Sequence, residues 1–161
     1  MATANKNLSD YDKSKLPKAG HLRIGLVVSE WNSQITENLY QGAYDTLLDC
    51  GVSEGNITRL DVPGSFELTF GCKKMIKNLE VDAVIAIGSI IRGETKHFDF
   101  VASATAQGIK DLNVTFDIPT IFCVLTDETL QQAIDRSGGK HGNKGSEAAV
   151  AAIQMAALSA I

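Results

Sequence analysis

The sequence predicts an α/β fold, a three-layer sandwich in which a four-stranded parallel sheet is flanked by helices on both faces. Short apolar runs alternate with longer segments of helical periodicity, and this alternation is typical of βα units around a parallel sheet. One run, residues 82–91, is apolar almost without alternation, as expected for a central strand covered on both faces. The chain of 161 residues also has the size of one ordinary domain.

Two βα units make up the first half of the chain. The first predicted strand is LRIGLVVS, residues 22–29, and a helix follows over about residues 33–50, where Gly51 is placed to end it. The second strand is NITRLDV, residues 56–62, and Pro63 stops it. The next helix gathers apolar side chains on one face at helical spacing, namely Leu68, Cys72, Met75, Ile76 and Leu79.

The second half of the chain repeats this pattern. After the central strand comes a helix whose spaced apolar residues are Phe98, Val101, Ala102, Thr105, Ile109 and Leu112. The fourth strand is IPTIFCVLT, residues 118–126, and a short helix over residues 127–136 is closed by Gly138 and Gly139. The last helix, residues 145–161, has small apolar side chains around nearly its whole circumference, which predicts burial on several sides, with a second subunit as one cover.

The elements together predict a flavodoxin-like arrangement. Residues 21–161 are expected to form a single domain, and residues 1–20 an N-terminal arm that is flexible or bound to a partner. This arm lacks the hydrophobic centre of a secretion signal, and no apolar stretch has the length of a membrane span.

Composition excludes several classes of function. The net charge of -4 leaves no broad basic field for nucleic acid or anionic lipid. An odd number of widely spaced cysteines indicates reduced core thiols in a cytoplasmic protein: Cys50, Cys72 and Cys123. No CxxC or HExxH occurs and the three histidines, His21, His97 and His141, lie far apart, so we expect no metal site.

Candidate site residues lie where the strands are predicted to end, because an open parallel sheet binds ligands beyond the carboxyl ends of its strands. Trp31 and Asn32 follow the first strand, PGSFE at residues 63–67 the second, and IIRGET at residues 90–95 the third. The fourth strand holds Phe122.

Residues 93–95 immediately precede a predicted helix, where free backbone N–H groups favour an anion such as phosphate. Thr95 would add its hydroxyl or would simply cap the helix. His97 follows in the first turn, either as a general base or as a solvated or capping side chain.

Other motifs leave their alternatives open. The ring of Trp31, the only tryptophan, would stack on a flat heterocycle or staple the next helix. Glu67 lies in the first turn of a predicted helix, where the helix dipole alone is enough to favour an acidic side chain. The stretch SGGKHGNKGS, residues 137–146, does not fit the spacing of a nucleotide-binding phosphate loop, and neither GxSxG nor GxGxxG is present.

Five stretches, in this order, resemble the lumazine synthase family: Trp31-Asn32, VPGSFE, GSIIRGETKHFDF, IPTIFCVLT and QQAIDRSGGKHGNKGSEAAVAAIQMA. The resemblance runs from about residue 22 to the C-terminus. It implies a transferase-class enzyme that condenses 5-amino-6-(D-ribitylamino)uracil with 3,4-dihydroxy-2-butanone 4-phosphate, releasing phosphate and water. This is the penultimate step of riboflavin biosynthesis, and the family needs neither metal nor cofactor.

The resemblance also implies a role for each site residue. His97 is the expected proton shuttle. The residues expected to hold the pyrimidine and its ribityl chain are Trp31, Ser65, Phe66, Glu67, Ile90, Ile91, Phe122 and Lys144. Those expected to hold the phosphate are Gly93, Glu94, Thr95 and Arg136. In the family Phe122, Arg136 and Lys144 reach the site from the neighbouring subunit, which implies a site shared between copies.

Assembly and partners follow from the same resemblance. It implies a homopentamer and, because the link before the last helix resembles that of the shell-forming members, an icosahedral capsid of twelve pentamers. Association with riboflavin synthase is a further implied partner. Trp31 replaces the phenylalanine of many members, and members with the larger ring also retain flavins, so riboflavin binding is an additional property implied for this site.

Two other classes of function remain as alternatives at this point. A flavin-sequestering or shell-forming protein without catalysis would lack the base or the phosphate ligands, whereas His97, Thr95 and Arg136 are all present. An aldolase-like enzyme would form a Schiff base on a lysine, but the sequence shows no apolar pocket around any of the candidates, Lys96, Lys140 and Lys144.

Overall fold

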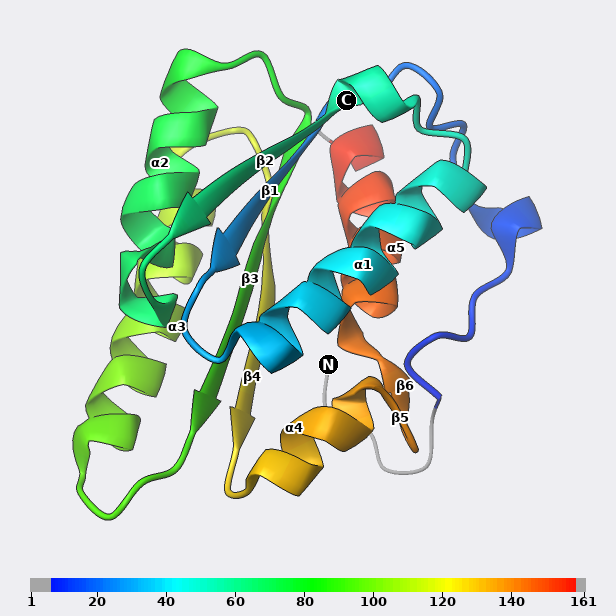
Figure 1. Ribbon diagram of the computed structural model, residues 1–161. Coiled ribbons are helices and arrows are strands. Elements are labelled where there is room, and N and C mark those ends of the chain that lie inside the picture. Colours follow the sequence, from blue (N-terminus) through cyan, green and yellow to red (C-terminus); the bar gives the residue numbers. More distant parts are fainter. Residues whose placement is uncertain (1–6, 159–161) are drawn as a thin grey trace.

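A computed structural model describes residues 7–158 and shows the predicted three-layer sandwich (Figure 1). The central sheet has four parallel strands in the order β2-β1-β3-β4, with the bounds Ile57–Val62, Ile24–Ser29, Ala83–Ile91 and Thr120–Asp127. This order is that of the flavodoxin-like arrangement, so the predicted fold class is confirmed.

Helices cover both faces of the sheet. Helices α2 (Leu68–Asn78) and α3 (His97–Thr115) lie on one face, and α1 (Ser33–Asp49), α4 (Leu130–Arg136) and α5 (Lys144–Leu158) on the other (Figure 1). Every residue of β1 and all but the last of β3 are buried, because both strands are covered on both faces. None of the helices in the described part of the chain is long and apolar enough to cross a membrane.

The predicted elements differ from the structure mainly at their ends. Residues 127–129, expected to begin the short helix, do not belong to it. Asp127 is the last residue of β4, where its carbonyl accepts the N–H of Arg92 at 3.0 Å. The helix begins only at Leu130, since the side chain of Thr129 caps it by accepting the N–H of Gln132 at 3.3 Å.

Two further differences concern short segments. Leu79, predicted on the apolar face of α2, follows the helix and is 46% exposed. A small antiparallel hairpin, β5 (Ser137–Gly139) and β6 (Gly142–Asn143), was not predicted. The predicted last helix extended to residue 161, of which residues 159–161 lie outside the described residues.

The described part of the predicted N-terminal arm runs back along the domain and includes a short 3₁₀ turn, Lys13–Lys15. The N–H of Leu8 donates to the carbonyl of His141 at 2.8 Å, and the Tyr11 hydroxyl donates to the Asp49 carboxylate at 2.6 Å. Residues 1–6 lie outside the described residues. The division into an arm and a single domain stays a prediction.

The three cysteines are free thiols, as predicted, although only two belong to the core. Cys72 and Cys123 are buried, and burial raises the pKa of each thiol to about 12. Cys50 is only half-buried. The two core thiols therefore stay protonated near neutral pH and act as packing groups.

Small side chains on α5 allow that helix to lie directly against α1. A Cβ atom at Gly145 would stand 1.9 Å from the carbonyl oxygen of Leu39, so no larger residue fits there without moving a helix. Ala148, Ala149 and Ala152 continue the same buried face. The opposite face carries Met155 at 40% exposure, and its predicted cover by a second subunit stays a prediction.

We expect Gly145→Ala to lower the free energy of unfolding by about 1–3 kcal/mol, because the added methyl group overpacks a helix contact made by backbone atoms. Urea unfolding followed by circular dichroism measures this change. Gly55→Ala is the matched control, since a Cβ atom at Gly55 meets nothing within 4 Å. Equal stability of the two variants would contradict the close approach of α1 and α5.

Candidate active site

A hollow of about 900 Å³ lies beyond the carboxyl ends of β1, β2 and β3, where an open parallel sheet is expected to bind ligands. Three loops and the first turns of α3 form its wall. The lining residues are Trp31, Asn32, Gly64, Ser65, Phe66, Glu67, Ser89, Ile90, Ile91, Gly93, Thr95, His97, Phe98, Phe100, Val101 and Ala104. This crevice brings together most of the side chains predicted from the sequence.

The loop after β1 is held by Asn32, whose backbone is left-handed with a φ of 60°. Asparagine tolerates this conformation better than most residues. Its side-chain amide donates to the carbonyl of Ser89 on β3 at 2.9 Å, which ties the loop to the central strand. The neighbouring Trp31 is 71% exposed at the mouth of the crevice, so its ring face is free to stack on a flat ligand.

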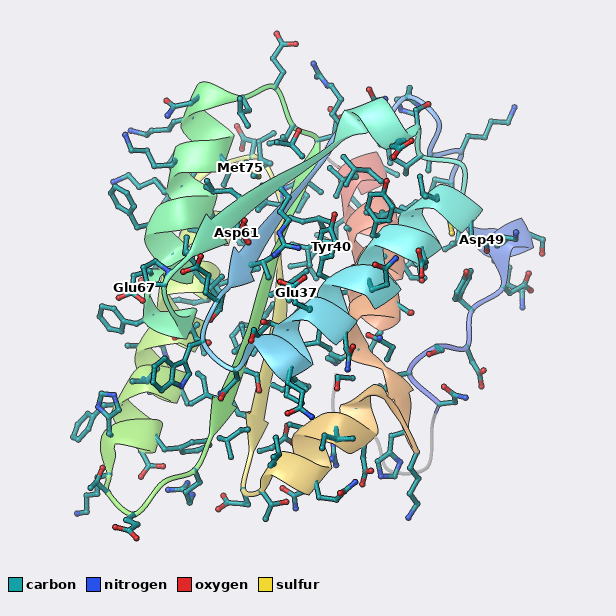
Figure 2. The ribbon with its side chains drawn as sticks, in the orientation of Figure 1. Glu37, Tyr40, Asp49, Asp61, Glu67 and Met75 are labelled. Carbon is teal, nitrogen blue, oxygen red and sulfur yellow. The ribbon has the colours of Figure 1, made fainter. Side chains whose placement is uncertain are left out.

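The loop after β2 forms a short 3₁₀ turn, Ser65–Glu67, before α2 begins. Ser65 is buried, and its carbonyl accepts the hydroxyl of Thr105 on α3 at 3.2 Å. Its own hydroxyl has no hydrogen-bond partner among the described residues. Phe66 is 59% exposed, and Figure 2 shows Glu67 beyond the end of β2. The turn therefore presents one ring and one carboxylate to the crevice, while the Ser65 hydroxyl oxygen is buried beneath them.

The loop after β3 carries the predicted anion site. Helix α3 begins at His97, so residues 93–96 lie just before its first turn, where N–H groups are free to bind an anion. The Thr95 hydroxyl accepts the N–H of His97 at 3.3 Å, although the cap position of the helix belongs to Lys96, which makes no side-chain cap hydrogen bond. Accepting this bond leaves the hydroxyl proton of Thr95 available to a ligand. His97 is exposed and lines the crevice with Thr95.

Arg92 lies in the candidate stretch at residues 90–95, but the sequence assigned it no role. It stands between the end of β3 and the anion loop, and its guanidinium pairs with Asp99 on α3 and with Glu128 after β4. The hydrogen bond from Arg92 holds the pKa of the Asp99 carboxyl below its usual range. No sequence signal marks these pairs, because Arg92 and Glu128 are brought together only by the pairing of β3 with β4.

Four predicted site residues lie outside the crevice of a single chain. Glu94 is exposed and does not line it. Arg136 ends α4, where its Nη1 donates to the carbonyl of Gln132 at 3.0 Å and lies 3.8 Å from Oδ1 of Asp127. Phe122 and Lys144 line a second hollow of about 700 Å³, between α5 and the N-terminal segment. Their contribution to a neighbouring copy's site stays a prediction.

Ionisable groups that could hold a metal do not gather in this crevice. Among residues 7–158 no group of three or more histidine, cysteine, aspartate or glutamate side chains is placed to bind an ion. The crevice instead combines an exposed aromatic face, a loop of free N–H groups and an imidazole, on two walls that face one space. This combination suits a ligand, or a pair of ligands, with a flat ring and a phosphate.

Fold and crevice together define a class, the doubly wound α/β proteins that bind ligands at the carboxyl edge of the sheet. The sequence profile of 6,7-dimethyl-8-ribityllumazine synthase matches residues 21–160. Proteins of that name from Flavobacterium johnsoniae and Christiangramia forsetii are 65% and 61% identical over 97% and 98% of this chain and 82% and 95% of theirs. That from Porphyromonas gingivalis is 56% identical over the full length of both chains. The chain belongs to the 6,7-dimethyl-8-ribityllumazine synthase family.

Proposed function

We propose that this chain condenses 5-amino-6-(D-ribitylamino)uracil with 3,4-dihydroxy-2-butanone 4-phosphate to form 6,7-dimethyl-8-ribityllumazine, releasing phosphate and water, in riboflavin biosynthesis. The observation that carries this function is the family match over residues 21–160. The crevice agrees with it, because one wall offers a ring face and another offers an anion loop. An amine and a ketone react readily once aligned, so positioning supplies most of the rate and proton transfer a smaller part.

Each wall of the crevice takes one part of the substrates. Trp31 stacks on the pyrimidine ring, and the backbone of Ile90 and Ile91 meets its edge. The turn at residues 65–67 holds the ribityl chain, whose hydroxyl groups can donate to the exposed Glu67 carboxylate. Residues 93–95 hold the phosphate through backbone N–H groups and the Thr95 hydroxyl.

A neighbouring copy completes the site with Phe122, Arg136 and Lys144. This division is supported by their position, since all three lie outside the crevice of their own chain. Phe122 is 37% exposed, and within residues 7–158 the polar partners of the Arg136 guanidinium are the Gln132 carbonyl and the more distant Asp127. The assembly proposed on this basis is a pentamer, and twelve pentamers as a 60-subunit shell.

The test of the function is to mix the two substrates with purified protein and follow the absorbance of the lumazine product. Product formed at a rate proportional to protein concentration, and far above the uncatalysed rate, is the expected result. Absence of product from freshly folded protein would overturn the proposed function.

We expect His97→Ala to lower kcat by about 100-fold, the low end of what acid–base catalysis contributes. The loss is partial because the reacting amine and ketone need a proton shuttle less than they need alignment. Steady-state assays with each substrate varied in turn measure it, and KM for both substrates should change little. An unchanged kcat would remove His97 from the proton-transfer steps.

A further inference from the structure

We propose that Arg92 is a positioning residue that holds the anion loop, residues 93–96, and His97 in the geometry that binds phosphate. The proposal rests on the proposed function of that loop. Arg92 does not line the crevice, so it acts on a ligand there through its neighbours rather than by direct contact. The loop itself is exposed along its whole length, and the space around Gly93 is open. Contacts at its two ends must therefore supply most of its order.

The first contact spans the loop from end to end. Arg92 Nη2 lies 2.9 Å from Asp99 Oδ1, and Arg92 Nη1 donates to Asp99 Oδ2 at 3.3 Å. Arg92 precedes the loop and Asp99 is the third residue of α3, so this two-point pair closes a ring around the loop and the first turn of the helix. A two-point pair fixes orientation as well as distance.

Two more contacts fix the guanidinium against the rest of the domain. Its Nε lies 2.7 Å from Oε2 of Glu128, which follows β4, and its central carbon, Cζ, lies 4.1 Å from the centroid of the Phe98 ring. Phe98 packs on the core cluster between the sheet and helices α2 and α3. The Arg92 backbone N–H also donates to the carbonyl of Asp127. The clamp of Arg92, Asp99 and Glu128 thus joins the anion loop to β4 and to the core.

Arginine is the residue that this geometry requires. A planar guanidinium can pair with two carboxylates and lie against a ring at the same time, whereas the point charge of a lysine satisfies one of them. The carboxylates of Asp99 and Glu128 are more than half exposed, so their pairs add little to global stability. What the clamp supplies is a loop that is already ordered before the ligand arrives.

The chain contains a matched control for this arrangement. Arg59 on β2 pairs with Glu37 through Nη1 at 2.9 Å and with Asp61 through Nε at 2.9 Å, and it lies 4.4 Å over the Tyr40 ring. Figure 2 shows Glu37 and Tyr40 on α1 and Asp61 on β2. None of these residues lines the crevice. Arg59→Gln therefore removes the same kinds of contact from a place that does not touch the anion loop.

The test compares Arg92→Gln, Asp99→Asn and Arg59→Gln in steady-state kinetics, with calorimetric titration of inorganic phosphate beside them. We expect Arg92→Gln and Asp99→Asn each to raise KM for the phosphorylated ketone, and Kd for phosphate, by about tenfold, with KM for the pyrimidine unchanged. Arg92→Lys should recover part of this loss. The double variant should be no worse than Arg92→Gln alone, because both changes open one clamp. Arg59→Gln should leave all three constants unchanged.

Two results would overturn the proposal. One is an equal KM for the ketone in Arg92→Gln and Arg59→Gln. The other is a lower kcat in Arg92→Gln with unchanged KM and unchanged phosphate affinity, which is the result that a smaller fraction of folded protein would give. Asp99→Asn keeps the proposal testable should Arg92→Gln fold poorly, since it opens the clamp with Arg92 in place. Phosphate titration tests the role of Arg92 separately from the proposed enzymatic function. A wild-type chain that binds phosphate but forms no lumazine defeats the proposed function, and the clamp is then judged by phosphate affinity alone.

Discussion

Arg136→Gln is expected to lower kcat/KM for the phosphorylated ketone by about two to three orders of magnitude, the largest loss of any single substitution in the proposed site. A guanidinium can pair with two phosphate oxygens, and a hydrogen bond to a charged group contributes about 1.5–3 kcal/mol. Glutamine keeps much of the length of the side chain but loses the positive charge and the pair of parallel N–H donors of the guanidinium. Assays with the ketone varied at saturating pyrimidine measure the change, and KM for the pyrimidine should stay close to its wild-type value.

Two companion variants sharpen this result. Arg136→Lys keeps the positive charge without the paired N–H donors, and its kcat/KM for the ketone should lie between those of the wild type and Arg136→Gln. Arg23→Gln removes an arginine that pairs with Glu80 and Asp82, away from the crevice, and should leave the kinetics unchanged. A loss of less than about tenfold in Arg136→Gln would show that the phosphate has another main anchor.

Within a single chain the Arg136 guanidinium is only loosely paired, which agrees with a role in binding a ligand. Its nearest carboxylate, Asp127, is buried, and one oxygen of that carboxylate has no partner among the described residues. Burial raises the pKa of the Asp127 carboxyl, and the nearby guanidinium opposes this rise only in part. At 3.8 Å the pair is loose, so a phosphate with better geometry can take the guanidinium at small cost.

The fold was predictable because periodicity survives in the sequence wherever an element is long and one of its faces is buried. The nearly unbroken apolar run at residues 82–91 predicts a central strand, and β3 is that strand. The hairpin of β5 and β6 carries no such signal, since its strands have three and two residues and are rich in glycine. Asp127 was predicted to begin a helix, whereas its backbone completes the pairing of β4 with Ile91 of β3.

The site was predictable to the extent that it lies at strand ends. Trp31, Ser65 and His97 come together because parallel strands deliver their carboxyl ends to one edge. Their chemical roles came from resemblance to a family, since each residue taken alone had a simpler structural explanation. Arg92 was assigned no role for a physical reason: its partners Asp99 and Glu128 lie on other elements, and only the assembled fold brings the three charges together.

Mixed assemblies are expected to recover activity that neither parent chain has, if Arg136 serves the crevice of a neighbour. One parent is Arg136→Gln, and the other is the double variant Trp31→Ala and His97→Ala, which loses the ring face and the proton shuttle. Co-expressed in equal amounts, they place an intact crevice beside an intact Arg136 at roughly a quarter of the interfaces. Activity should therefore return to roughly a quarter of the wild-type level, well above either parent alone.

The same experiment distinguishes a shared site from a self-contained one. Were Arg136 to fold back onto the anion loop of its own chain, every chain in the mixture would still carry one defect, and mixing would give only the average of the two parents. Two differently tagged Arg136→Gln chains, co-expressed in the same way, control for an effect of co-expression itself. The distribution of side chains favours recovery, because Arg136, Phe122 and Lys144 lie outside the crevice that their own loops build.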